Sequence, residues 1–287
     1  MRSGLLPMLG LLACSAAQHA IADNISGAAL PGWRELVYEQ RSFWASARST
    51  LTLDECAKEP GWCTVIRSEV GDNREEISLR TDRAGMLQTR ERFSQGRDQR
   101  KKLWSYTARA VHRQRFEPAS DEQASSNGWQ QTSDRLINYP DDITGVTDAH
   151  LLLALAAADR ERQFLVHTDM NFYRVTLTPA GEDLIKLSES LTLPGPSHRE
   201  VDLVALTATL VGEARDKPDF ALLGLSGALH IALDRETGLP LQIHGRAPRL
   251  GQITINLARA TLRQPALRQP ELRQPVLRQP ELRQHAP

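Results

Sequence analysis

The sequence predicts a mainly β protein, a large curved antiparallel sheet or partly closed barrel with one central amphipathic helix. Three observations support this prediction. Apolar residues alternate with polar ones along many short segments, turn-forming residues separate these segments, and one segment, residues 148–162, shows helical spacing instead. Alternation with period two buries one face of a strand, whereas helical spacing gathers apolar side chains along one stripe. Strands that precede and follow a single helix are typical of a sheet that curves around it.

The first 22 residues have the features of a secretory signal peptide. Arg2 precedes an apolar run that ends in small residues, and the run is shorter than the roughly 20 residues of a membrane-spanning helix. We favour cleavage after Ala22, because Ala20 and Ala22 fit the rule of small residues at the cut. The alternative is a lipobox that ends at Cys14, which would anchor the protein through a lipid. The protein is therefore expected to be periplasmic or secreted, or lipid-anchored through Cys14, with no transmembrane segment in the mature chain.

Either processing route leaves two cysteines, Cys56 and Cys63, in the mature chain. The dipeptide Pro60-Gly61 lies between them and favours a turn that brings them together. A redox pair usually has the closer C-x-x-C spacing, and no second Cys or His pair stands nearby to complete a metal shell. An even count in an oxidising compartment predicts a disulfide between Cys56 and Cys63 and no metal site.

Strands are expected both before and after the helix. The clearest are in "ALHIALD", "LPLQIHG" and "GQITINLA", where apolar residues alternate and turn-like linkers separate the segments, as in an antiparallel meander. The expected strands cover residues 35–40, 48–53, 63–70, 75–81, 86–93, 103–110, 171–178, 201–211, 229–233, 239–243 and 253–257.

The helix is expected over residues 148–162, three to four turns long and lying on the sheet. Thr147 or Asp148 can cap its start, and Arg160 and Arg162 stand near its end, where cations are favourable. Its apolar positions at helical spacing are Leu151, Leu152, Leu155 and Ala158.

Residues 23–260 are expected to form a single β-rich domain, and residues 261–287 a disordered tail of LRQP repeats. Proline recurs every five residues in the tail and removes backbone donors, which excludes a helix. In polyproline II geometry a five-residue period builds no continuous apolar face. One interpretation is a tether, or weak multivalent binding to anionic envelope surfaces or to a partner. We favour the other, neutral repeat expansion at a terminus that disturbs no core.

The charges exclude one class of partner. Lys plus Arg equals Asp plus Glu, 35 of each, so the chain lacks the basic excess that sequence-independent binding to nucleic acid needs. We therefore expect no nucleic-acid partner.

Two acidic motifs are candidates for chemistry. His167 and Asp169 form an H-x-D triplet, and on a strand they would point the same way, as a metal site or a catalytic base requires. We favour a solvated strand end, since no third ligand is indicated. Asp141 and Asp142 follow Pro140, where a turn is a better interpretation than an acid–base pair.

Other catalytic motifs are incomplete or missing. The "GLSGAL" stretch around Ser226 lacks the spacing of a nucleophile elbow and leads into a strand. The sequence has no P-loop, dinucleotide fingerprint or zinc-hydrolase motif. We predict no catalytic residues and no cofactor. Exposed tryptophans could line an apolar or sugar site, but core filling is the favoured role for the five, Trp33, Trp44, Trp62, Trp104 and Trp129.

The C-terminal part of the chain resembles a known family. The residues that carry the resemblance are Asp234, Gly238-Leu239-Pro240-Leu241 and Leu250-Gly251-Gln252-Ile253, with the order of elements over residues 145–260. They resemble exported proteobacterial proteins of domain-of-unknown-function family three-one-zero-eight. The resemblance implies a periplasmic curved β-sheet protein of unsettled role, and it implies no catalytic residues.

Two function classes stay open at this point. The first is a non-catalytic envelope protein that holds an apolar or amphipathic envelope molecule, or a partner, between the concave face of the sheet and the helix. The alternative is a periplasmic hydrolase whose site is too dispersed in the sequence to recognise. The missing motifs favour the first class. The ligand-binding residues and the oligomeric state are not predicted by the sequence.

Overall fold

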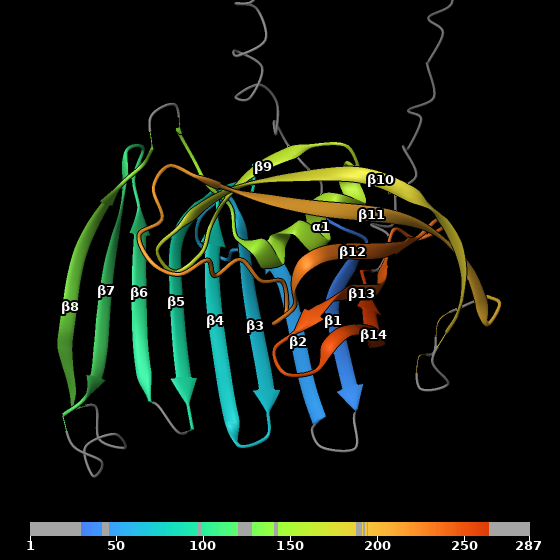
Figure 1. Ribbon diagram of the computed structural model, residues 1–287, viewed down its shortest axis with the longest axis horizontal. Helices are drawn as coiled ribbons and strands as arrows, with labels where there is room; N and C mark the ends of the chain where they lie inside the picture. The colour runs from blue at the N-terminus through green and yellow to red at the C-terminus, as the bar shows by residue number, and fades with distance from the viewer. Residues whose placement is uncertain are drawn as a thin grey trace, which may run out of the picture.

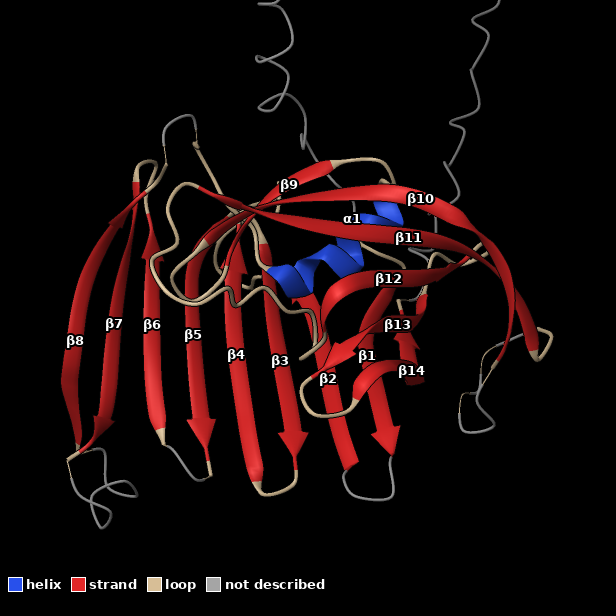
Figure 2. Cartoon of the chain, viewed as in Figure 1, coloured by secondary structure: helices blue, strands red, loops and turns tan. Residues whose placement is uncertain are grey.

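A computed structural model describes residues 30–41, 46–96, 99–119, 128–140, 143–187, 191, 193 and 195–263. Its strands form a 14-stranded sheet in the order β8-β7-β6-β5-β4-β3-β2-β1-β14-β13-β12-β11-β10-β9, which is open because β8 and β9 end the order. All neighbouring strands are antiparallel. Strands dominate the drawing and the helix is short (Figure 2). The predicted fold class is therefore confirmed.

The first eight strands are β1 (Trp33–Arg41), β2 (Ser46–Glu55), β3 (Trp62–Val70), β4 (Asn73–Thr81), β5 (Leu87–Gln95), β6 (Arg100–Tyr106), β7 (Ala110–Pro118) and β8 (Trp129–Asn138). A short 3-10 helix η2 (Ala149–Leu151) and the helix α1 (Leu152–Ala158) follow. The last six strands are β9 (Gln163–His167), β10 (Phe172–Lys186), β11 (His198–Val211), β12 (Ser226–Asp234), β13 (Pro240–Ala247) and β14 (Gly251–Leu262).

The sheet folds over on itself. β9–β11 cross the upper part of β1–β4, and α1 lies between the two layers (Figure 1). Residues 146 and 147 join the layers, because Leu87 at the start of β5 donates a backbone hydrogen bond to Val146, while Thr147 bonds with Leu165 and His167 of β9. In the described part of the chain, no helix is long and apolar enough to span a bilayer.

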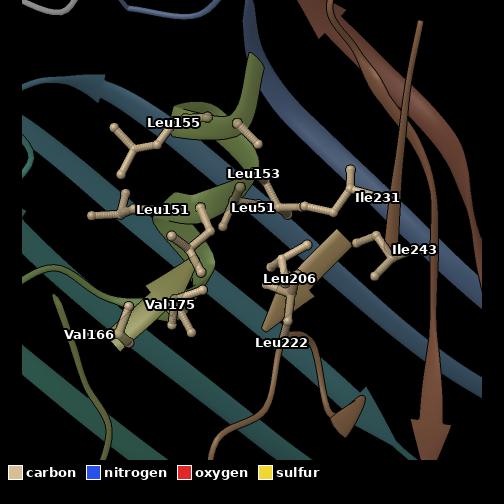
Figure 3. Close-up of a cluster of buried hydrophobic side chains, with 14 of the residues drawn as sticks. Leu51, Leu151, Leu153, Leu155, Val166, Val175, Leu206, Leu222, Ile231 and Ile243 are labelled. Carbon is tan, nitrogen blue, oxygen red and sulfur yellow. The ribbon is translucent and has the colours of Figure 1, made fainter. Parts of the chain in front are cut away.

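The helix is buried from Leu152 to Ala156, while Ala158 at its end is exposed. Leu152, Leu153 and Ala156 are fully buried, and leucines of the helix meet side chains from both layers (Figure 3). A helix that is apolar all round belongs inside a core, and α1 is such a helix between the two layers rather than one with a solvated polar face. The expected ligand position between helix and sheet is filled by side chains of the protein itself, including Leu51, Val175 and Leu206.

The helical segment is shorter than expected. Asp148 caps it as predicted, accepting a hydrogen bond from the backbone N–H of His150, but α1 ends at Ala158. Asp159 is already extended, Arg160 pairs with Asp202 of β11, and the Arg162 carbonyl accepts a bond from Leu177. Tertiary contacts of the two arginines therefore replace the predicted last turn.

Most predicted strands are present, and the final meander has the expected antiparallel pairing of β12 with β13 and of β13 with β14. Several bounds differ, and β10 continues to Lys186, eight residues beyond its predicted end. Residues 103–110 were expected to form one strand, yet they span the end of β6, a turn and the start of β7. β8 and β9 were not expected at all. β14 continues to Leu262, so the first two residues of the predicted tail belong to the sheet.

Cys56 and Cys63 form a disulfide that links the ends of β2 and β3. Trp33, Trp62 and Trp104 are buried in the core, as the favoured interpretation of the tryptophans requires. Trp129 is half-buried and packs edge-to-face against Phe93, with ring centroids 5.8 Å apart. Trp44, Cys14 and the tail beyond Arg263 lie outside the described residues.

Candidate functional site

His167 is the last residue of β9, and its side chain is completely buried. Its Nδ1 lies 3.0 Å from the Tyr106 hydroxyl, and its ring packs against Phe172. Burial, followed by the nearby Arg90 charge, lowers the pKa of His167 to about 3. The imidazole is therefore neutral at physiological pH, and at that pKa it is a weak base.

Asp169 lies beyond the end of β9, in the turn that leads to β10. Its carboxylate accepts a hydrogen bond from Arg113 Nε at 2.7 Å and pairs with Lys102. Burial alone would raise the pKa of Asp169, but the Arg113 hydrogen bond and the Lys102 charge outweigh it and hold that pKa well below its usual range. His167 and Asp169 thus have separate partners, and the turn keeps them from acting together as a metal site or catalytic pair. The favoured interpretation, a solvated strand end, is wrong for His167, because the second layer buries its ring.

A buried arginine fastens this turn to the sheet. Arg90 of β5 donates to the carbonyl of Thr168 at 2.9 Å, and its guanidinium lies 4.7 Å from the ring centre of Trp104. Its counter-ion is Asp148, the cap of the helical segment, at 3.4 Å, and Asp148 also contacts His150. The charges of Arg90 and His150 outweigh the effect of burial and lower the pKa of Asp148. Nothing in the local sequence distinguishes Arg90, which stands among other charged and polar residues in "QTRERFS".

A second carboxylate holds the turn from the other side. Asp219 accepts hydrogen bonds from the Thr168 hydroxyl at 2.7 Å and from Asn171 Nδ2 at 3.1 Å. Its other oxygen accepts the backbone N–H of Asp169 at 3.1 Å. Residues 167–171 are thereby fixed against both the sheet and the loop before β12.

These contacts support a structural role for the polar cluster. Ser226, which the sequence places in an incomplete nucleophile elbow, donates to the Arg246 carbonyl at 3.3 Å, and no His, Asp or Glu side chain of the described residues is hydrogen-bonded to its hydroxyl. The described residues contain no group of three or more His, Cys, Asp or Glu side chains able to hold a metal ion. Asp141 and Asp142 lie outside the described residues.

The concave face carries a further feature that the sequence did not reveal, a band of cations on β5–β8. Two cross-strand rows share this face: Arg90, Trp104, Arg113 and Arg135 in one row, and Arg92, Lys102, Arg115 and Ser133 in the next. The buried Trp104 and Arg113 fix the side of the sheet to which the first row belongs. We call the six cationic side chains of these rows, together with Trp104 and Ser133, the basic band. The lower parts of its strands, β5–β8, lie clear of β9–β11 (Figure 1).

An open groove adjoins the basic band where β7 and β8 face the turn at Met170. Its first part has a volume of ≈ 350 Å³ and is lined by Arg113, Arg115, Glu117, Thr132, Ser133, Arg135, Met170 and Asp216. Its second part, of ≈ 550 Å³, is lined by Arg135, Leu136, Ile137, Asn138, Met170 and Arg215. Arg135 and Met170 line both parts, so a polar hollow continues into a more apolar one.

Comparisons with known proteins identify a similar structure of unknown function. No family model matches the chain, and no curated protein matches it. Among solved structures, it is similar to a beta-barrel-like protein of domain of unknown function DUF1849 from Brucella abortus, with 11% sequence identity and a TM-score of 0.49. The match covers 82% of this chain and 100% of that chain. Membership of family three-one-zero-eight stays a prediction.

Proposed function

We propose that this chain is a non-catalytic protein of the cell envelope that binds a molecule or a partner on the open part of its concave face. The observation that supports the proposal is the division of that face. Beneath β9–β14 it is filled by α1 and the core, whereas along β7 and β8 it borders an open groove. The signal sequence and the Cys56–Cys63 disulfide are consistent with an envelope location.

The two candidate side chains for a hydrolase, His167 and Asp169, are not suited to acid–base catalysis. His167 is buried, weakly basic and bound to Tyr106, and Asp169 is neutralised by Lys102 and Arg113. A general base needs both access to its substrate and a pKa near the working pH. These residues are therefore assigned to holding the turn that forms one wall of the groove.

Site-specific photocrosslinking in the native envelope tests the proposal. A photoreactive amino acid at Thr132, in the groove, should capture a bound molecule, and one at Ser105 on the opposite face of the same layer should not. The captured molecule should be recovered chemically unchanged. The Ser105 position controls for random collisions.

The hydrolase alternative predicts a different result. Under it, His167→Gln abolishes function in a complemented deletion strain although the protein stays folded, and a processed product is recovered. Absence of any adduct specific to Thr132 would contradict the binding proposal.

A further inference from the structure

The basic band has a charge arrangement that folding alone does not favour. Three pairs of cations lie directly opposite each other on neighbouring strands: Arg92 with Lys102, Lys102 with Arg115, and Arg113 with Arg135. Like charges in such positions destabilise a sheet. On the outer face of the same strands the arrangement is reversed, because Lys101 pairs with Glu91 and His112 with Asp134.

The protein neutralises most of the basic band with its own carboxylates. Arg90 pairs with Asp148, Arg92 with Glu75, Arg115 with Glu117, and Lys102 and Arg113 share Asp169. Among the described residues Arg135 has no hydrogen-bond or ion-pair partner, and Arg115 Nε is buried without one. Two residues with unpaired donors, Arg115 and Arg135, therefore line the groove beside the hydroxyl groups of Thr132 and Ser133, whereas the unpaired Nε of Arg90 lies away from it.

We propose that the groove binds the phosphate of an anionic amphipathic lipid. This inference rests on the proposed function and names its ligand class. A phosphate presents more acceptor oxygens than a carboxylate and can bridge several guanidinium groups, and Arg supplies the planar donors that match it. Met170 and Ile137 continue the groove beyond Arg135 on this face. Leu136, which is 69% exposed, adjoins the groove from the outer face of the edge strand β8, so the exposed apolar surface for acyl chains lies at the edge of the sheet next to the phosphate. Asp169 occupies part of the same cationic surface as an internal anion.

The test measures binding of the full-length mature protein to vesicles of phosphatidylcholine with or without phosphatidylglycerol. Wild type should bind only the vesicles that contain phosphatidylglycerol. Arg115→Gln/Arg135→Gln should weaken this binding about tenfold or more, since each lost charge-assisted hydrogen bond contributes more than 1 kcal/mol. The matched control is Arg74→Gln/Arg109→Gln, which removes the same charge from exposed positions and keeps the arginine-rich tail.

A second variant should bind the vesicles more tightly than wild type, which a basic band with only a structural role does not predict. Asp169→Asn removes the internal anion, so binding to phosphatidylglycerol vesicles should tighten severalfold while circular dichroism confirms the fold. Unchanged or weaker binding by a folded Asp169→Asn protein contradicts the proposal.

The remaining outcomes separate this inference from the proposed function. Equal losses in the groove variant and the control would assign vesicle binding to general charge and overturn the inference. If soluble glycerol phosphate binds as tightly as the vesicles, the apolar part of the groove is not used and the lipid source is wrong. If wild type does not bind the vesicles but the photoreactive group at Thr132 still captures a specific molecule, the proposed function stands and only the assignment of the ligand as an anionic lipid is wrong.

Discussion

The side chain of His167 shows how burial decides what a titratable residue can do. In an unfolded chain a histidine has a pKa near 6.5, whereas here burial lowers the pKa of His167 to about 3. The unfolded state therefore binds more protons than the folded state between these two values. Stability from this group is fully present above about pH 6.5 and is lost as the pH falls toward about 3.

We expect His167→Gln to flatten the acid side of the stability curve. Urea unfolding at a series of pH values gives the free energy of unfolding. Below pH 6 this free energy should fall more steeply for wild type than for the variant, by about 1.4 kcal/mol per pH unit. The exposed His198→Gln serves as the control and should follow wild type. Parallel curves for wild type and His167→Gln would mean that His167 is protonated in the folded state.

The buried pair of Arg90 and Asp148 leads to a second prediction. Arg90→Met removes the cation and leaves the Asp148 carboxylate buried, which should lower the free energy of unfolding by about 3–5 kcal/mol. Arg34→Met breaks an exposed pair with Asp54 and should cost less than about 1 kcal/mol. Denaturant unfolding measures both, and adding Asp148→Asn to Arg90→Met should recover part of the loss. Equal effects of the two single substitutions would contradict the assigned burial.

Among the elements, the hairpin of β2 and β3 is the one with a covalent link. Its short closed loop predicts that Cys56→Ala/Cys63→Ala loses about 2–3 kcal/mol of stability through a freer unfolded chain. Denaturant unfolding gives the loss, and intact mass after alkylation with and without reductant reports the bond in native protein. Two freely alkylated thiols in protein from the periplasm would show that the disulfide is absent there.

Strand β14, the last strand along the chain, pairs with the first strand, β1. Leu262 pairs with Trp33, and the Arg263 N–H donates to the Gly32 carbonyl at 2.9 Å. This pairing places β1 between β2 and β14, so the sheet continues from its first eight strands into its last six. The predicted tail boundary after Ala260 therefore cuts into the sheet.

At the scale of the whole molecule, two truncations locate the end of the folded domain. A chain that ends at Arg263 should melt within about two degrees of the full chain, because a disordered terminus contributes few contacts. A chain that ends at Ala260 loses the pairing of Thr261 and Leu262 with β1 and should melt several degrees lower. For a domain of this size, each kcal/mol of lost stability lowers the melting temperature by about 2–4 degrees. Calorimetry checks both. A large drop for the longer chain would show that the repeats stabilise the body.

The whole molecule also explains why the concave face is divided. The layer of β9–β14 meets the first layer at α1 and at residues 146 and 147, and it does not extend over the lower part of β5–β8 (Figure 1). Those strands can therefore carry charged residues on the same face that is apolar under the helix. The proposed binding surface is a consequence of one layer being broader than the other.

The sequence by itself determined the features that depend on neighbouring residues. Alternation in residues 229–257 predicts β12, β13 and β14, Asp148 is one of two predicted caps, and the spacing of Cys56 and Cys63 predicts their bond. Each follows from local geometry, because period, capping and loop closure act over a few residues. The signal peptide, the tail and the family resemblance remain predictions from the sequence.

Only the tertiary structure decided which charged residues are buried and which of them meet. Arg90 and Asp169 have ordinary polar contexts in the sequence, yet the folded sheet places Arg90 beside Asp148 and places Asp169 between Lys102 and Arg113. The helix became a core helix because two layers cover it, and the row of Arg113 and Arg135 formed because β8 pairs with β7. These outcomes depend on strand register and on the second layer, which bring together residues far apart in the chain, and no local period encodes either.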